Sequence, residues 1–240
     1  MWQSDVANQG FAIISDVLTR ADIVAILKNL DKESVPRSRA GMRHALALPS
    51  IAALAWDSRM LKLAREVLGK KAFPYHATLF DKSPDANWLV TWHQDTALPL
   101  RERRDTPGWG PWSLKRGVVY AHAPASALSK MLALRVHLDD STAQNGPLRV
   151  LPGSHAQGVL TDAHIHQLAS RISSVECVVS QGGILAMRPL LIHASSKSRS
   201  EKKRRVLHIE YAASAVFANG LRLVKGKKPS RMDCYTKSSP

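Results

Sequence analysis

From residue 72 onward, short runs rich in β-branched and aromatic residues alternate with segments that contain proline, glycine or asparagine. Runs of this length and punctuation are typical of strands joined by turns. The predicted strands are 73–81, 88–93, 117–122, 131–139, 147–151, 175–179, 183–188, 190–194 and 204–213. Regular short strands of this kind favour a β-sandwich or jelly roll.

The first 70 residues combine a helical periodicity with one short extended run. A hydroxyl residue three positions ahead of an acid marks one helix start, and a glycine marks one helix end. Residues 31–49 carry charge and a proline, which indicates an exposed connection. The predicted elements are a strand at 10–14, a helix at 23–30 behind the capping box Thr19–Asp22, and helices capped by Ser50 and Ser58, the second ending at Gly69.

Two of the predicted strands carry polar groups on a face that would otherwise be buried. In 204–213 the face with Arg204, His208 and Glu210 is polar, whereas the alternate residues are mostly apolar. In 131–139 the polar face carries Arg135, His137 and Asp139. Two strands with such faces predict a polar lumen inside the jelly roll.

The chain has 240 residues, 45% of them hydrophobic, which is enough for one sizeable core. We expect a single domain: a helical part at about 1–70, a jelly-roll core at about 72–215, and a basic C-terminal tail. The sequence shows neither a signal peptide nor a run of 18 apolar residues, and its two cysteines allow no disulfide framework. These features predict a cytoplasmic protein without a membrane span.

The formal net charge of +15 gathers in three runs, at 101–104, 197–205 and 221–231. Such a field attracts anions, so it favours an anionic small molecule or, less readily, nucleic acid. A well-solvated surface explains the same charge, and no zinc-finger or RRM motif is present. The oligomeric state is not predicted by any of these features.

The spacing His-x-acid occurs three times, at His93–Asp95, His137–Asp139 and His208–Glu210. With 10 His and 19 acidic residues in 240, chance alone produces roughly one such pair, so spacing cannot choose among them. Context favours His93, because it precedes a stretch of loop residues where a strand end can present ligands. The other two pairs lie inside patterned strands, where they are more often pocket lining or satisfied core groups.

Together with the pair His93 and Asp95, a third residue that is distant in sequence would complete a metal site. His93 and Asp95 point the same way from a strand end, and His193 ends an apolar run on a second strand. Two imidazoles and one carboxylate hold a ferrous ion on one face and leave the opposite positions open. Taken alone, however, His193 is more often a core residue than a ligand. Arg204 on the next strand has the planar fork that binds a carboxylate.

Four stretches together resemble the phytanoyl-CoA dioxygenase (PhyH) family of Fe(II)/2-oxoglutarate oxygenases. They are LFDKSPDANWLVTWHQD, NGPLRVLPGSH, MRPLLIHASS and RRVLHIEYA, within about 75–213. The resemblance implies a double-stranded β-helix, cupin-like and mainly β, with flanking α-helices. It also implies Fe(II), 2-oxoglutarate and O₂ as cofactor and co-substrates.

The resemblance implies a role for each matching residue. His93, Asp95 and His193 correspond to the iron ligands, and Arg204 with Ser195 to the groups that bind the far (C5) carboxylate of 2-oxoglutarate. Gln94, Thr78 and Arg135 fall where the co-substrate is contacted or its pocket is lined. Arg205 competes with Arg204, and strand alternation allows only one of them to face inward.

The expected reaction is hydroxylation, or a related oxidation, of a small molecule with release of succinate and CO₂. Asp95 favours this over halogenation, because related halogenases have a small residue in place of the carboxylate ligand. Residues 97–116 are predicted to form a substrate-covering loop, and His155 of PGSH to shape a turn. The alternative is a nucleic-acid- or anion-binding protein on the same scaffold without oxygenase turnover.

Overall fold

The computed structural model describes residues 1–32, 41–115 and 117–226, and it places most of the strands in two antiparallel sheets. The larger sheet contains, in spatial order, β1 (Phe11–Ile14), β11 (Ile184–Met187), β8 (Met131–His137), β13 (Arg204–Ala212), β3 (Phe73–Lys82) and β2 (Met42–Arg43). The smaller sheet contains β10 (Val175–Cys177), β9 (Leu148–Val150), β12 (His193–Ser195) and β4 (Val90–His93).

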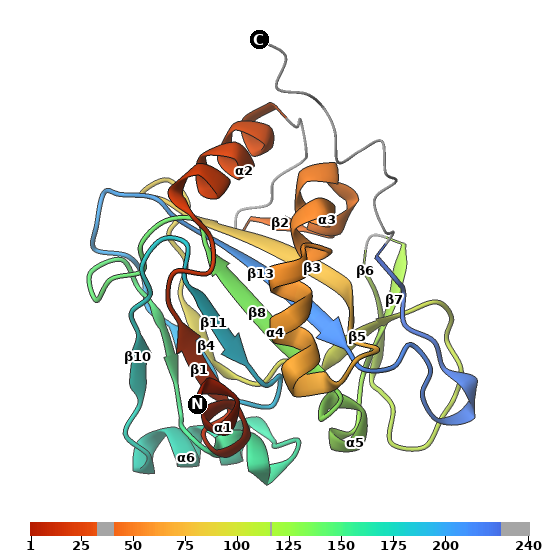
Figure 1. The fold of residues 1–240 in the computed structure, drawn as a ribbon. Helices are drawn as coiled ribbons and strands as arrows, with labels where there is room; N and C mark the ends of the chain where they lie inside the picture. The colour runs from red at the N-terminus through yellow and green to blue at the C-terminus, as the bar shows by residue number, and fades with distance from the viewer. Residues whose placement is uncertain (33–40, 116, 227–240) are drawn as a thin grey trace.

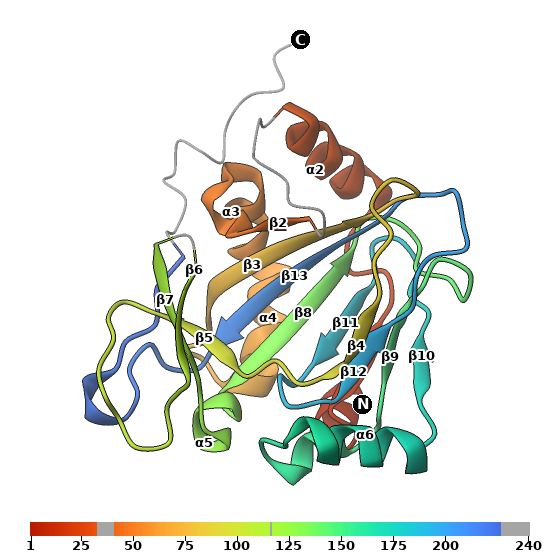
Figure 2. The ribbon, with the colours of Figure 1, turned by 180° about the vertical axis from the view of Figure 1, so that it is seen from behind.

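Helices cover one face of the larger sheet, and the smaller sheet lies on the other side. Figure 1 shows α2 (Arg20–Lys32), α3 (Pro49–Ala55) and α4 (Ser58–Leu68) in front of the larger sheet. Figure 2, from behind, shows β4, β9, β10 and β12 on the opposite side. This arrangement of antiparallel sheets confirms the predicted β-rich fold with flanking helices.

The main core forms where the helices meet the larger sheet. Leu207, Ile209 and Tyr211, which alternate with the polar residues of β13, are fully buried there. The Tyr211 hydroxyl donates a hydrogen bond to the carbonyl oxygen of Ala55 in α3 (2.8 Å). Because one face of β13 packs against helices, its polar face must point between the two sheets. No helix of the described residues is long and apolar enough to cross a membrane.

The helix boundaries confirm part of the prediction and correct the rest. The Thr19 N–H donates to Asp22 Oδ2 (2.8 Å) and the Asp22 N–H to Thr19 Oγ1 (3.2 Å), which is the predicted capping box. Gly69 ends α4 with φ of 88°. Ser58, however, is the first helical residue, because Asp57 caps α4 by accepting from the Arg59 N–H.

The sequence prediction placed other elements wrongly or missed them. Ser50 lies inside α3, which begins with Pro49 as its first residue. Residues 31–32 belong to α2, and 33–40 lie outside the described part of the chain. Met42 and Ala45 are buried, so this part of 31–49 is not an exposed connection. The helices α1 (Trp2–Asn8), α5 (Ala125–Leu128) and α6 (Asp162–Arg171) were not predicted.

The stretch 97–116 is not one long loop. It contains β5 (Ala97–Leu100) and β6 (Trp112–Lys115), which flank β7 (Val118–His122) in a three-stranded sheet. Each of the two outer strands has four residues and pairs antiparallel with β7. The prediction failed because proline and glycine dominate the segment between the two strands, and because β5 reaches its partner only through pairing distant in sequence.

Strand β8 ends earlier than predicted, and this moves Asp139 away from the lumen. The strand stops at His137, so the alternation that placed Asp139 beside Arg135 no longer holds. Its carboxylate instead accepts hydrogen bonds from the backbone N–H and guanidinium group of Arg205 (all 2.8 Å). The run 190–194 is also corrected, because its strand begins only at His193.

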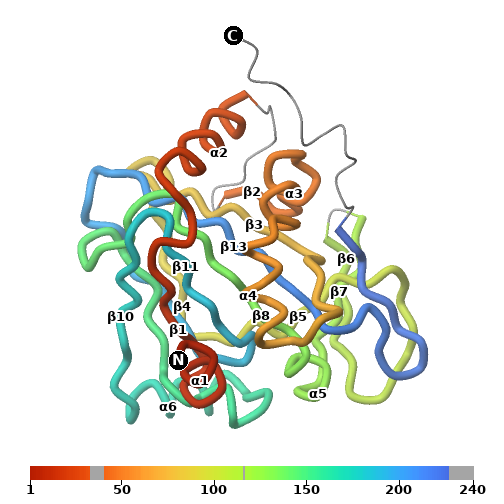
Figure 3. The backbone as a smooth tube through the Cα atoms, in the orientation of Figure 1, coloured from red at the N-terminus to blue at the C-terminus, as the bar shows by residue number. Residues whose placement is uncertain are grey.

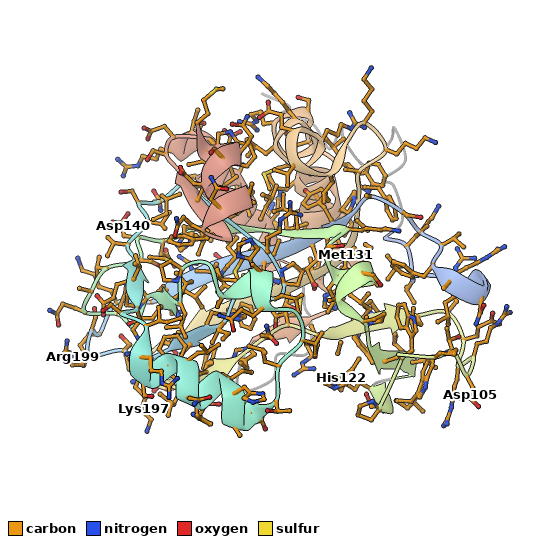
Figure 4. All side chains as sticks on the ribbon, turned by 90° about the horizontal axis from the view of Figure 1, so that it is seen from below. Asp105, His122, Met131, Asp140, Lys197 and Arg199 are labelled. Atoms are coloured by element: carbon orange, nitrogen blue, oxygen red, sulfur yellow. The ribbon has the colours of Figure 1, made fainter. Side chains whose placement is uncertain are left out.

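Two of the basic runs, 101–104 and the described part of 221–231, lie side by side, and the third, 197–205, lies apart from them. Figure 4 shows Asp105, next to the run 101–104, and Lys197 and Arg199, in the run 197–205, at opposite sides of the molecule. The run 221–231 is described only as far as residue 226. In this part, the Arg222 carbonyl oxygen accepts a hydrogen bond from the Arg101 N–H (3.0 Å). The rest of the predicted basic tail lies outside the described residues.

Candidate active site

The three predicted metal ligands come together at neighbouring strand ends. His93 ends β4, Asp95 follows it, and His193 begins β12. The two strands pair antiparallel, with His193 directly opposite His93. One ligand atom from each residue lies within 4.8 Å of the other two. The Nε2 atoms of His93 and His193 are 3.7 Å and 3.5 Å from the Asp95 carboxylate oxygens.

The imidazole rings of His93 and His193 are each oriented by a hydrogen bond at Nδ1, which leaves Nε2 facing the metal position. His93 Nδ1 donates to the carbonyl oxygen of Thr91 (2.8 Å), and His193 Nδ1 donates to that of Leu191 (2.9 Å). Since a carbonyl oxygen only accepts, each Nδ1 carries a hydrogen, and in the neutral ring Nε2 then keeps its lone pair for a metal. Burial also lowers the pKa of His193 to about 4, so this ring is neutral at pH 7, as a ligand must be.

Asp95 remains ionised at the wall of the cavity, where part of its side chain is still exposed. Burial acts to raise its pKa, but His193, His208, His93 and Arg135 outweigh this and keep the pKa below its usual value. Two ligands at right angles on a first-row divalent ion lie about 3 Å apart. The observed separations need only a small inward movement to match, and the set of two imidazole nitrogens and one carboxylate suits Fe(II).

A Ser154 hydrogen bond fixes the segment that carries His193. Ser154, in the PGSH turn, is fully buried, and its Oγ accepts from the N–H of Ile192 (2.9 Å). The Gly153 N–H donates to the Gln9 carbonyl oxygen just after α1 (2.9 Å), and Figure 3 shows α1 beside the part of the chain that contains α6. The ring of His155 contacts the Ala7 carbonyl oxygen (3.1 Å) rather than the metal site. These contacts agree with a turn-shaping role for this motif.

The ligands open into a cavity of about 360 Å³ between the sheets. Its floor is the polar face of the larger sheet, and the small β5–β7–β6 sheet adds one wall. Besides the three ligands, the lining residues are Arg43, His76, Thr78, Phe80, Trp88, Val90, Gln94, Thr96, Ala97, Lys115, Tyr120, His122, Arg135, Leu148, Ser195, Arg204, His208 and Glu210.

Arg204 lies at one end of this cavity, whereas Arg205 is paired with Asp139 outside it. The Arg204 side chain is buried, and its Nε donates to the Asn145 carbonyl oxygen (3.1 Å). Burial and the nearby Arg135 lower the pKa of Arg204 to about 10, so it remains charged at pH 7. Its terminal nitrogens are therefore available for an anion in the cavity.

Comparison with known protein families assigns the chain to one of them. The family model of phytanoyl-CoA dioxygenase (PhyH) matches residues 6–206. The chain belongs to this family. The predicted family and fold are therefore confirmed, and the prediction of an iron- and 2-oxoglutarate-dependent enzyme is confirmed at the level of the family.

Individual relatives of this PhyH-family chain are distant. L-proline trans-4-hydroxylase from Streptomyces griseoviridis is 25% identical over 178 residues, which are 63% of this chain and 59% of that protein. Among solved structures, AviO1 from Streptomyces viridochromogenes Tue57 has a TM-score of 0.65 at 21% identity, covering 91% of this chain and 95% of the other. EctD from S. alaskensis with 2-oxoglutarate and 5-hydroxyectoine has a TM-score of 0.66 at 19% identity, covering 88% and 74%.

Three other predicted residues of the PhyH-family site also line the cavity. Thr78 lies on β3, opposite His208 of β13. Arg135 is buried, contacts His208 Nδ1 (3.0 Å) and stacks over Phe80, with 5.2 Å from its guanidinium carbon to the ring centroid. The Ser195 Oγ donates to the Gly146 carbonyl oxygen (3.0 Å).

Gln94 also lines the cavity, and its side-chain amide is bound to the backbone. Its Nε2 donates to the carbonyl oxygens of Gly158 and Leu190 (2.8 Å each), and its Oε1 accepts from the Leu160 N–H (2.9 Å). Because these three bonds engage both ends of the amide, Gln94 braces the segment between His93 and Asp95, and its contact with the co-substrate stays a prediction.

Sequence reasoning missed the residues at the other end of the cavity. His76 Nδ1 contacts Glu210 Oε2 (2.6 Å), and the Tyr75 hydroxyl donates to Glu210 Oε1 (2.8 Å). His76 shares a strand face with Thr78, so alternation along β3 could have revealed it. Tyr120 Oη lies 3.5 Å from His76 Nε2.

His137, which the sequence left as either pocket lining or a satisfied core group, is buried on the inner face of β8 and is not among the residues that line the cavity. Within the described part of the chain, neither of its ring nitrogens has a hydrogen-bond partner. Burial, followed by Arg135 and Arg204, lowers its pKa to about 3. The folded protein therefore holds this imidazole neutral over the whole mildly acidic range.

We expect His137 to make folding stability depend on pH. Between its folded pKa of about 3 and the ordinary value of 6.5, the unfolded chain binds the extra proton, so stability falls as the pH is lowered through this range. His137→Asn should reduce the slope by up to about 1.4 kcal/mol per pH unit. Urea unfolding of both proteins at pH 4.5, 5.5 and 6.5 measures this, and parallel slopes would contradict it.

Proposed function

We propose that this chain is an Fe(II)- and 2-oxoglutarate-dependent dioxygenase that oxidises a small molecule and releases succinate and CO₂. One observation carries the proposal. Two imidazole Nε2 atoms and one carboxylate converge in the wall of a cavity that is also lined by a buried arginine. Family membership supports the same activity.

Each residue of the site then has a defined task. His93, Asp95 and His193 would hold iron, and Arg204 with Ser195 would bind the far carboxylate of 2-oxoglutarate. Thr78 and Arg135 would line the space between these two points. When bound, iron with 2-oxoglutarate and O₂ supplies the oxidising chemistry, and the presence of Asp95 favours hydroxylation. The enclosing sheets limit access of water to the reacting groups.

The outer half of the cavity supports an anionic substrate. Arg43 and Lys115 line it, and the Lys115 ammonium lies 5.2 Å from the centroid of the Tyr120 ring. Burial, followed by Glu210, raises the pKa of Tyr120 to about 12, so its hydroxyl stays protonated and can donate. The Glu210 carboxylate accepts one hydrogen bond on each oxygen, from Tyr75 and His76. The groups free to bind a ligand are therefore mainly donors, which suit a carboxylate.

A succinate-release screen tests both parts of the proposal. The protein is incubated with Fe(II), ascorbate, O₂ and 2-oxoglutarate, with and without candidate substrates. L-proline and other small amino acids come first, because the curated relative is an L-proline hydroxylase. Stimulation by a carboxylate but not by its amide, for example L-proline against L-prolinamide, is expected. Iron-independent or absent conversion with every candidate would contradict the activity.

The rival role, anion or nucleic-acid binding without turnover, gives a distinct result. The run 197–205 lies on the opposite side of the molecule from the run 101–104, which does not favour one continuous nucleic-acid track through all three runs. Micromolar binding of DNA or RNA that falls steeply with salt, together with no succinate release, would replace the proposal.

A further inference from the structure

A lysine buried beside Arg204 has no role in the proposed function so far. Lys82, the last residue of β3, is 1% exposed and lies directly opposite Arg204 in the β3–β13 ladder. Its ammonium group donates to Ser195 Oγ (3.0 Å) and to the Ser196 carbonyl oxygen (2.6 Å). It also lies 5.2 Å from the centroid of the Trp88 ring. Three of these neighbours, Arg204, Ser195 and Trp88, line the cavity.

The charges around Lys82 are unbalanced. In the described part of the chain, no carboxylate lies within ion-pair distance of its ammonium group, although burying a charge without an opposite partner is costly. Burial first, and then Arg204 and Arg135, lower the pKa of Lys82 to about 8. Two neighbouring cations thus repel each other in a poorly solvated place, which an anion between them would relieve.

We propose that Lys82 is a second cation of the carboxylate-binding end of the cavity, which positions Ser195 and stabilises the far carboxylate of 2-oxoglutarate together with Arg204. This inference rests on the proposed function. The arrangement keeps the site positively charged before the co-substrate arrives, at a cost to the stability of the ligand-free protein. A lysine with a purely structural role would have the opposite effect, since its removal would destabilise the fold.

The test compares two keto acids that differ at one end. Binding is measured by calorimetry with Mn(II) in place of iron, so that no turnover occurs. Pyruvate offers the keto acid group that would bind the metal but lacks the far carboxylate of 2-oxoglutarate. Lys82→Met should raise the Kd of 2-oxoglutarate by roughly tenfold or more and leave the Kd of pyruvate unchanged. Without ligand, this variant should melt higher by roughly 2–4 °C.

Two further variants make the result specific. Lys62→Met makes the same charge change on the exposed face of α4 and should alter neither Kd. Lys82→Arg keeps the charge and should retain most of the affinity for 2-oxoglutarate. Unchanged 2-oxoglutarate binding by Lys82→Met, equal losses for both keto acids, or a lower melting temperature would overturn the inference. If wild-type protein binds neither keto acid, the proposed function itself fails, and this inference fails with it.

Discussion

Replacing His93 by alanine is expected to remove iron binding and all 2-oxoglutarate turnover. His93 supplies one of three ligand atoms, and its Nε2 is the ring nitrogen that has no backbone partner. Loss of groups that only orient metal ligands already lowers metal affinity by about 10–100-fold, so loss of a ligand should cost more than about 100-fold. Anaerobic Fe(II) titration and the succinate assay measure the two effects.

The other His-x-acid pairs provide the control for this experiment. His137 is buried near the same cavity, but it is not part of the three-ligand cluster. His137→Asn should therefore bind iron as the wild type does. If His93→Ala kept its iron while His137→Asn lost it, the metal centre would have been assigned to the wrong pair.

Replacing Arg204 by alanine is expected to weaken 2-oxoglutarate by about 2–5 kcal/mol, the usual effect of removing one partner from a buried charge pair. Iron binding should persist, because Arg204 is not in the metal-ligand cluster. Calorimetry with the Mn(II) protein gives the change in Kd directly. The assay should also show a higher KM for 2-oxoglutarate.

Arg205 is the matched control, since it follows Arg204 on the same strand. Its guanidinium group is paired with Asp139, so Arg205→Ala should lower stability slightly and leave 2-oxoglutarate affinity unchanged. A loss of affinity in Arg205→Ala with none in Arg204→Ala would mean that the two side chains exchange places in solution.

The sequence could predict the inner and outer faces of β13 because the ladder is regular over most of the strand. Pairing with β3 runs from Arg204 without interruption and shifts only between Glu210 and Tyr211. Because side chains alternate between the two faces of a strand, the sequence alone assigned Arg204 and His208 to the face opposite the core residues. The same rule failed for Asp139, because periodicity does not reveal where a strand ends.

Contacts made by single side chains could not be predicted in the same way. Gln94 lies between two ligands, which suggested a co-substrate contact, but its amide binds backbone groups 64 to 96 residues away. Lys82 gave no signal because a lone lysine at the end of a strand is usually exposed. Only the folded chain shows that Ser195, on another sheet, reaches its ammonium group.

The pairing of His93 with His193 also bears on how the protein holds together. The two histidines belong to adjacent strands of a small sheet, yet one hundred positions separate them along the chain. An ion bound to both would act as a cross-link that closes a very long loop, as a disulfide does elsewhere. Catalysis and mechanical integrity of this sheet would then depend on the same atom, and iron starvation would weaken both together.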